Sequence, residues 1–131
     1  MRFLYVLLSW LAAPVFVGHL LWRSLRQPGY RRRIAERFGF GFRRLPVPSI
    51  WIHAVSVGEV TAAAPLLRAL RERHPATPVV VTTMTPTGSE RARDLFGSSV
   101  IHCYVPYDAP GPVRRFFDWV RPGLVVVLET E

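Results

Sequence analysis

The sequence predicts an α/β domain with a parallel sheet, preceded by a membrane-anchor helix. From residue 50 onward, short runs of β-branched residues alternate with longer amphipathic stretches, which is the pattern of βαβ units. Residues 3–22 carry no formal charge, and as a helix they would extend about 30 Å, the thickness of a bilayer core. Arginines follow this run directly. These observations favour a Rossmann-like half behind one anchor.

The positive charge of the chain is confined to one segment. The 131 residues carry a formal net charge of +8, and residues 23–44 hold eight arginines against a single acid, Glu36. From residue 45 onward, eight arginines meet eight acids. Because the domain itself is neutral, the sequence does not indicate a nucleic-acid partner.

The apolar run also predicts on which side of a membrane the domain lies. Positive-inside bias would place the arginines, and everything after them, in the cytoplasm. A cleaved signal peptide and a buried or surface-lying apolar helix are the alternatives, and the downstream arginines disfavour the signal peptide. We therefore expect an anchor at 1–22, an arginine-rich juxtamembrane segment and linker at 23–49, and the domain at 50–131.

Three consecutive arginines, Arg31, Arg32 and Arg33, are expected to face anionic lipid head groups, where each charge contributes roughly 1 kcal/mol. The alternative is that this segment only sets the topology of the anchor. The lone cysteine, Cys103, fits a reducing compartment.

Each element of the domain follows from its own pattern. We expect strands at 50–56, 79–84, 100–107 and 124–129, and helices at 59–73, 87–96 and 112–120. The first helix has an apolar stripe formed by Val60, Ala63, Ala64, Leu67 and Leu70. The last strand, in "LVVVLETE", is continuously apolar, as a central strand buried on both faces would be.

The carboxyl ends of these strands carry the polar residues. Ligands of open parallel sheets bind there, and hydroxyl, glycine and carboxylate groups suit polyhydroxylated or phosphorylated ligands. No glycine-rich nucleotide fingerprint and no histidine spacing typical of zinc occurs, so we expect neither a cofactor nor a metal. His53 is interpreted as a core histidine with satisfied hydrogen bonds in preference to a catalytic one.

Ser56 and Glu59 stand in the S-x-x-E spacing of a capping box, in which each side chain satisfies a backbone N–H of the other. The same glutamate, placed after a Ser-Val-Gly turn at a strand end, has the position of a general base. The residues alone leave both interpretations open.

Five ordered motifs, "GYRRRIAERFG", "WIHAVSVGE", "VTTMTPTGSERA", "HCYVPYD" and "RPGLVVVLETE", resemble the amino-terminal half of the bacterial 3-deoxy-D-manno-octulosonic acid (Kdo) transferases. The resemblance implies a GT-B glycosyltransferase, inverting and anchored in the cell inner membrane. Its amino-terminal half would face the lipid A precursor that accepts Kdo, and its carboxyl-terminal half would bind most of the donor, CMP-Kdo.

The resemblance also assigns roles to residues. It implies that Glu59 of the S-V-G-E motif is the catalytic base, with Ser56 and Gly58 beside the substrate. Further substrate-binding residues would be Thr83, Thr85 and Gly88 of the acceptor-side loop and Glu129 and Glu131 of the E-T-E motif. For the threonines the alternative role is helix capping, and for the two acids it is a solvated strand end.

The sequence stops inside the last of these motifs, before any donor-binding half. We therefore expect a fragment of a longer enzyme that is inactive alone. One alternative is a membrane-tethered module that binds anionic lipid through its arginines without catalysis. Another is a glycosyltransferase of the same fold that uses a different nucleotide sugar.

Overall fold

The computed structural model describes residues 11–12, 14–15, 17–19, 22 and 33–129. The described residues up to 22 are helical, and the elements whose bounds are defined begin with a short helix before the sheet. In chain order the elements are α2 (Ile34–Arg37), β1 (Ser49–Ala54), α3 (Val57–Arg73), β2 (Val79–Thr83), α4 (Pro86–Phe96), the 3-10 turn η2 (Gly97–Ser99), β3 (Ile101–Tyr104), α5 (Pro110–Val120) and β4 (Pro122–Leu128). The alternation of strands and helices predicted from residue 50 onward is confirmed.

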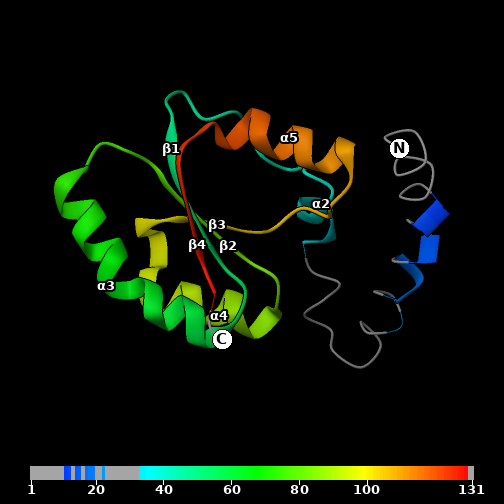
Figure 1. Cartoon of the computed structure of the whole chain (residues 1–131), viewed down its shortest axis with the longest axis horizontal. Coiled ribbons are helices and arrows are strands. Elements are labelled where there is room, and N and C mark those ends of the chain that lie inside the picture. The colour runs from blue at the N-terminus through cyan, green and yellow to red at the C-terminus, as the bar shows by residue number, and fades with distance from the viewer. Residues whose placement is uncertain (1–10, 13, 16, 20–21, 23–32, 130–131) are drawn as a thin grey trace.

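The four strands form one parallel sheet in the order β3-β2-β1-β4. Helices α3 and α4 lie on one face of this sheet and α5 lies on the other (Figure 1). Crossing from β3 over to the far side of β1 takes the chain past α5, so the direction of winding changes between β1 and β4. This is the strand order of a Rossmann-like half.

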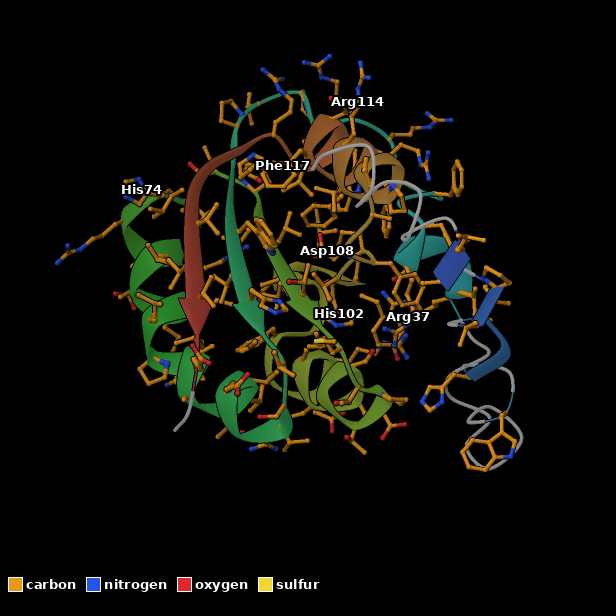
Figure 2. All side chains as sticks on the ribbon, turned by 45° about the vertical axis from the view of Figure 1, so that its right-hand side comes forward. Arg37, His74, His102, Asp108, Arg114 and Phe117 are labelled. Atoms are coloured by element: carbon orange, nitrogen blue, oxygen red, sulfur yellow. The ribbon has the colours of Figure 1, made fainter. Side chains whose placement is uncertain are left out.

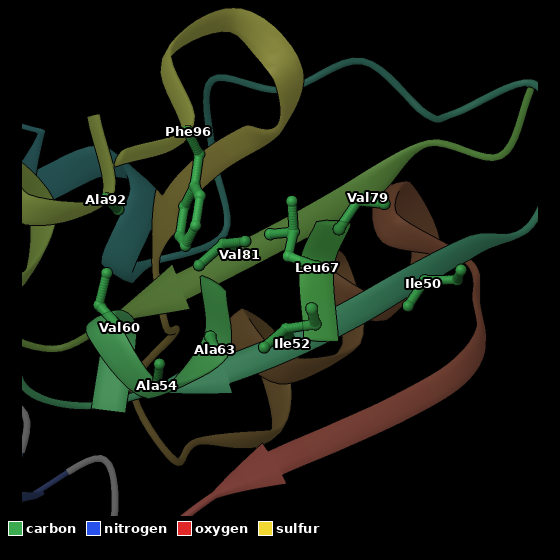
Figure 3. Close-up of a cluster of buried hydrophobic side chains, with 10 residues drawn as sticks. All are labelled: Ile50, Ile52, Ala54, Val60, Ala63, Leu67, Val79, Val81, Ala92 and Phe96. Carbon is green, nitrogen blue, oxygen red and sulfur yellow. The ribbon is translucent and has the colours of Figure 1, made fainter. Parts of the chain in front are cut away.

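The core under α3 and α4 is built from small and branched side chains (Figure 3). Ile52, Ala54, Val60 and Ala63 have no exposed surface, and the two alanines let α3 approach β1 closely. Burial of each large apolar side chain here stabilises the fold by about 1.5–3 kcal/mol. The predicted apolar stripe of the first helix is therefore the face that packs on the sheet.

The second core, under α5, includes the segment expected to be a linker. Phe42 stacks on Trp119 with 4.2 Å between ring centroids, and the backbone N–H of Leu45 donates to Trp119 O. Gly39 makes this packing feasible, since it has φ 74° and a Cβ there would lie 2.7 Å from Pro112 O. Residues 38–48 are thus an integral layer of the domain.

Most predicted bounds lie within two residues of those observed, and two strands differ more from the prediction. Strand β3 ends at Tyr104, short of the expected residue 107, where Pro106 removes a backbone donor. Strand β4 is an edge strand of the described sheet, and Leu124, Val125 and Val127 are exposed. Its continuous apolar sequence therefore does not mark a strand covered on both sides within the described part of the chain.

The predicted membrane anchor falls mostly on residues outside those described. Among the described residues, no helix has both the length and the apolar character needed to cross a bilayer. The anchor stays a prediction.

Candidate functional site

The strand order points to one place on the sheet where a ligand could bind. The direction in which successive strands are added to the sheet reverses between β1 and β4, and binding sites of open parallel sheets lie beyond the carboxyl ends of strands at such a switch point. The register pairs Ala54 with Leu128, so the turn into α3 and the end of β4 are neighbours there. Figure 1 shows β4 running toward the start of α3. Glu59 lies in that first turn.

Glu59 is a buried carboxylate, 7% exposed, and its Oε2 accepts backbone N–H bonds from Val55 at 2.5 Å and Ser56 at 3.2 Å. Ser56 Oγ in turn accepts from the backbone N–H of Glu59 at 3.4 Å. The predicted capping box is therefore confirmed. These bonds also fix the orientation of the carboxylate at the positive end of α3, where a negative charge is favoured. The role as general base stays a prediction.

Gly58 lies in the same turn and leaves room beside it. It is exposed, and a Cβ there would meet only Ser56 Oγ, at 3.9 Å. Since no packing requires a glycine here, the free space above its backbone is available to a ligand.

The loop from β2 to α4 lies against the loop that carries Glu59. The backbone N–H of Met84 donates to Val55 O at 3.4 Å. Thr85 caps α4, because its Oγ1 accepts from Gly88 N at 3.1 Å. Gly88 is a packing residue, since a Cβ there would lie 3.3 Å from Val55 O and 3.0 Å from Thr85 Oγ1. Of the three residues predicted in the acceptor-side loop, Thr83 and Gly88 are buried, and the half-buried Thr85 reaches the surface of this site.

Thr83 does not occupy the position expected of a substrate contact. It has no exposed surface, and its Oγ1 lies 2.9 Å from His102 Nε2. Its side chain points into the layer under α4, because strand residues alternate between the two faces and Thr83 shares the face of Val79 and Val81. The direct substrate role predicted for Thr83 therefore disagrees with its burial.

The acidic end of β4 is described only in part. Glu129 follows Leu128 directly and is exposed, next to the switch point. Glu131 lies outside the described residues. Both roles in substrate binding stay predictions.

The arginines predicted to face lipid separate into two groups. Arg31 and Arg32 lie outside the described residues. The guanidinium of Arg33 instead turns into the domain, where it donates to Glu36 Oε1 at 2.5 Å, to Ser89 Oγ at 3.1 Å and to His102 O at 2.7 Å. A guanidinium engaged by three partners in this way does not face a head group, so the expectation for Arg33 is corrected.

His53 is half-buried and makes one of the hydrogen bonds expected of a core histidine. Its Nδ1 lies 2.8 Å from Thr82 Oγ1, which also accepts from Trp51 Nε1 at 2.9 Å. Burial lowers the pKa of His53, and the nearby Glu59 carboxylate opposes that shift. The ring is therefore neutral at physiological pH.

Helix α2 was not recognised in the sequence as part of the site region. Arg33, Glu36 and Arg37 bind groups on β3 and on the loop after β2, more than forty positions further along the chain. One signal could have identified them: Glu36 is the only acid among the arginines of residues 23–44, and a lone acid in such a stretch indicates a specific partner.

Two hollows in the described surface lie away from the switch point. One of about 310 Å³ lies between α3 and α4, and one of about 330 Å³ lies between residues 39–44 and α5. Within residues 33–129 and the few described residues before them, no three His, Cys, Asp or Glu side chains cluster as metal ligands would.

Comparisons with known proteins agree on one family. The sequence profile of the family described as 3-deoxy-D-manno-octulosonic-acid transferase (kdotransferase) matches residues 32–131. The chain is 46% identical to the 3-deoxy-D-manno-octulosonic acid transferase of Haemophilus influenzae, over 99% of this chain and 31% of that enzyme. It is 37% identical to the enzyme of the same name from Bordetella pertussis, over 85% of this chain and 28% of that enzyme.

The chain thus spans less than a third of the length of these relatives. No solved structure matches it significantly.

Proposed function

Since the chain belongs to the Kdo transferase family, we propose that it is the amino-terminal part of a glycosyltransferase that moves Kdo from CMP-Kdo to a lipid A precursor in lipopolysaccharide biosynthesis. Relatives similar over nearly the whole chain are named for Kdo transfer. The observation that carries the proposal is Glu59, a carboxylate with a fixed orientation at the switch point of a parallel sheet. The part of the enzyme that corresponds to the rest of these relatives would bind most of the donor, CMP-Kdo.

The proposed chemistry needs one proton acceptor on this part of the enzyme. An acceptor hydroxyl of the lipid loses its proton to Glu59 as its oxygen attacks the anomeric carbon of Kdo. The bond between that carbon and the phosphate oxygen breaks, and CMP leaves as a phosphate monoester anion. A positioned carboxylate contributes typically 10²–10⁴-fold to such a step.

The lipid acceptor suggests where the enzyme works. We propose that the chain is anchored by residues 1–22 in the inner membrane, with the domain on the cytoplasmic side. The apolar run and the arginines that follow it support this placement. Arg31 and Arg32 remain candidates for contact with anionic lipid. The exposed Gly58 and the half-buried Thr85 are candidates for contact with the acceptor sugar.

Substituting Glu59 by Gln in the complete transferase separates the base from the cap. Glutamine also completes a capping box, because its amide oxygen accepts the same backbone N–H bonds. We expect Kdo transfer to fall by about 10²–10⁴-fold, while the denaturation midpoint and acceptor binding stay close to wild type. Glu59→Ala, which removes both functions, should lose transfer and in addition about 1 kcal/mol of stability.

Near-normal turnover of E59Q would return Glu59 to the capping role alone. If, in addition, replacing Arg31 and Arg32 by Gln abolished binding to anionic vesicles, the membrane-tethered lipid-binding module would be the better description.

A further inference from the structure

Arg33 and Arg37, the N-cap and the last residue of α2, make three separate contacts with residues 83–89, which run from the end of β2 through the loop into the start of α4. Arg37 Nη2 donates to Met84 O at 2.8 Å, and Arg33 Nη1 donates to Ser89 Oγ at 3.1 Å. The third contact passes through His102, which lies between Arg33 and Thr83. Figure 2 shows Arg37 and His102 in the region where α2 meets the sheet. These contacts reach Thr83 at the end of β2, Met84 in the loop and Ser89 at the start of α4.

We propose that α2 holds this loop in place and that Arg37 is a positioning residue for the sugar acceptor. The inference rests on the proposed function, which makes residues 83–89 the acceptor-side loop. Arg37 would act through Met84 and Thr85 and would not touch the acceptor itself.

The environment of Arg37 is built for a guanidinium. The side chain is 4% exposed, and its guanidinium carbon lies 4.2 Å from the centre of the Tyr104 ring, a cation–π distance. Its own backbone carbonyl accepts from Tyr107 N at 2.8 Å, which ties α2 to the loop after β3. A buried cation is costly unless its hydrogen bonds are made, so the bond to Met84 O stabilises the guanidinium in the folded state.

The hydrogen bonds around His102 have a fixed direction. A guanidinium only donates, so His102 Nδ1, 3.1 Å from Arg33 Nη1, is the acceptor. The ring proton therefore lies on Nε2 and is donated to Thr83 Oγ1 at 2.9 Å. Burial first, and then the charges of Arg33 and Arg93, lower the pKa of His102 to about 3, so the ring stays neutral. Arg33 thus orients the hydroxyl at the start of the loop.

Arg33 and Glu36 can be explained as residues that cover the edge of the sheet, but the bond from Arg37 to Met84 O cannot. Arg33 donates to His102 O, and Glu36 Oε2 accepts from Tyr104 N at 3.0 Å, so both residues satisfy backbone groups of edge strand β3. Met84, however, follows the end of β2 and belongs to no strand. The contact of Arg37 with Met84 O therefore requires another reason, and loop placement supplies one.

The Met84 residue is held from two sides. Its N–H donates to Val55 O, in the turn that carries Glu59, and its C=O accepts from Arg37. Loss of Arg37 would remove the bond to Met84 O, while the contacts of Arg33 and the turn with Glu59 stay intact. An acceptor held by Thr85 would then bind less well or in poorer alignment, with the base unchanged.

The test compares Arg37→Gln with Arg115→Gln in the complete transferase. Arg115 is a control with the same kinds of contact at a half-buried position: its Nε donates to the backbone carbonyl of Phe38, the C-cap of α2, at 2.9 Å, and its guanidinium carbon lies 4.2 Å from the Phe40 ring centre, but it makes no bond to Met84. We expect R37Q to raise the acceptor KM by about tenfold or more, since small displacements of positioning groups have large effects. The KM for CMP-Kdo should change less than twofold, and R115Q should leave both values near wild type.

A second measurement covers the case in which R37Q folds poorly. Amide hydrogen exchange of residues 83–89 should be faster in Arg37→Lys than in wild type, and unchanged in Arg115→Lys, with the acceptor KM of R37K between those of wild type and R37Q. Equal acceptor KM values in wild type and R37Q, or in R37K where R37Q does not fold, would overturn the inference. So would the same increase in the Arg115 variants. If the wild-type enzyme transferred no Kdo at all, the proposed function itself would fail.

Discussion

Gly58 and Gly88 both lie in the first turn of a helix at the carboxyl end of the sheet, yet they are glycines for different reasons. A Cβ on Gly88 would be 3.0 Å from Thr85 Oγ1 and 3.3 Å from Val55 O, so packing requires a glycine there. A Cβ on Gly58 would enter open space. Only a group from outside the described chain would be displaced by a side chain at residue 58.

Replacing each glycine by alanine distinguishes these reasons. Gly58→Ala should leave stability unchanged or raise it by up to about 1 kcal/mol, because alanine favours the helix, and should lower Kdo transfer by about tenfold. Gly88→Ala should instead lose about 1–3 kcal/mol through overpacking. Urea denaturation and initial transfer rates of the complete enzyme measure both effects. Wild-type activity of G58A would remove Gly58 from the ligand contacts.

At the scale of elements, α2 and the edge strand β3 are joined by groups whose bonding depends on charge. His102 lies between Arg33 and Thr83, with a pKa lowered to about 3 by burial and by neighbouring arginines. A protonated ring could no longer accept from Arg33 and would add a positive charge beside it. Acid should therefore weaken the docking of α2 on β3.

The predicted effect is a loss of stability on acidification. His102 has an ordinary pKa of 6.5 when unfolded and about 3 when folded, so between these values the unfolded chain binds one more proton. Its contribution to the free energy of unfolding is thus constant above about pH 6.5 and falls with decreasing pH, by up to about 1.4 kcal/mol per unit. Urea denaturation from pH 7 to pH 4 should show a steeper decline for wild type than for His102→Gln. Parallel curves would contradict this assignment.

Periodicity in the sequence was sufficient for most elements and failed where long-range contacts decide. Prolines at the starts of α4 and α5 and the apolar runs of β1 and β2 are local signals, and the structure follows them. Residues 23–49 were expected to be a juxtamembrane segment and linker, with Gly and Pro interrupting their last part, but Phe42 and Trp119, far apart in the chain, stack on each other. No local pattern encodes that contact.

The site shows the same division. The S-x-x-E spacing is local, and it predicted the bonds between Ser56 and Glu59 correctly. Thr83 was expected to contact substrate because the resemblance placed it in the acceptor-side loop. Its burial depends on His102 from another strand, and on Arg33 behind it, at a separation that the sequence does not reveal.

At the scale of the whole molecule, the outer edge of the sheet is apolar and exposed. Val127 on β4 is 62% exposed, with Leu124 and Val125 beside it, and relatives of the chain are about three times as long. An open apolar edge strand is prone to pair with other chains. We infer that in the complete enzyme further chain covers this side of β4.

Residues 33–131 produced alone should therefore aggregate, and Val127→Lys should raise their soluble fraction. In the complete enzyme the same substitution should lower stability by about 1–3 kcal/mol, because the lysine would then be buried. Light scattering of the isolated segment and thermal unfolding of the complete protein provide the comparison. A monodisperse wild-type segment would show that the β4 edge needs no cover.

The two backbone hydrogen bonds of Met84, one from its N–H and one to its C=O, limit where residues can be inserted into or deleted from this chain. The N–H is fixed to the turn before α3 and the C=O to α2, so one residue added between 83 and 88 would pull three segments out of alignment. At the opposite end of the sheet, residues 74–76 after α3 are exposed, and the backbone bonds of His74, to Leu70 O and from Thr77 N, are local ones. Insertions and deletions should accumulate there, while the loops around Glu59 keep a constant length.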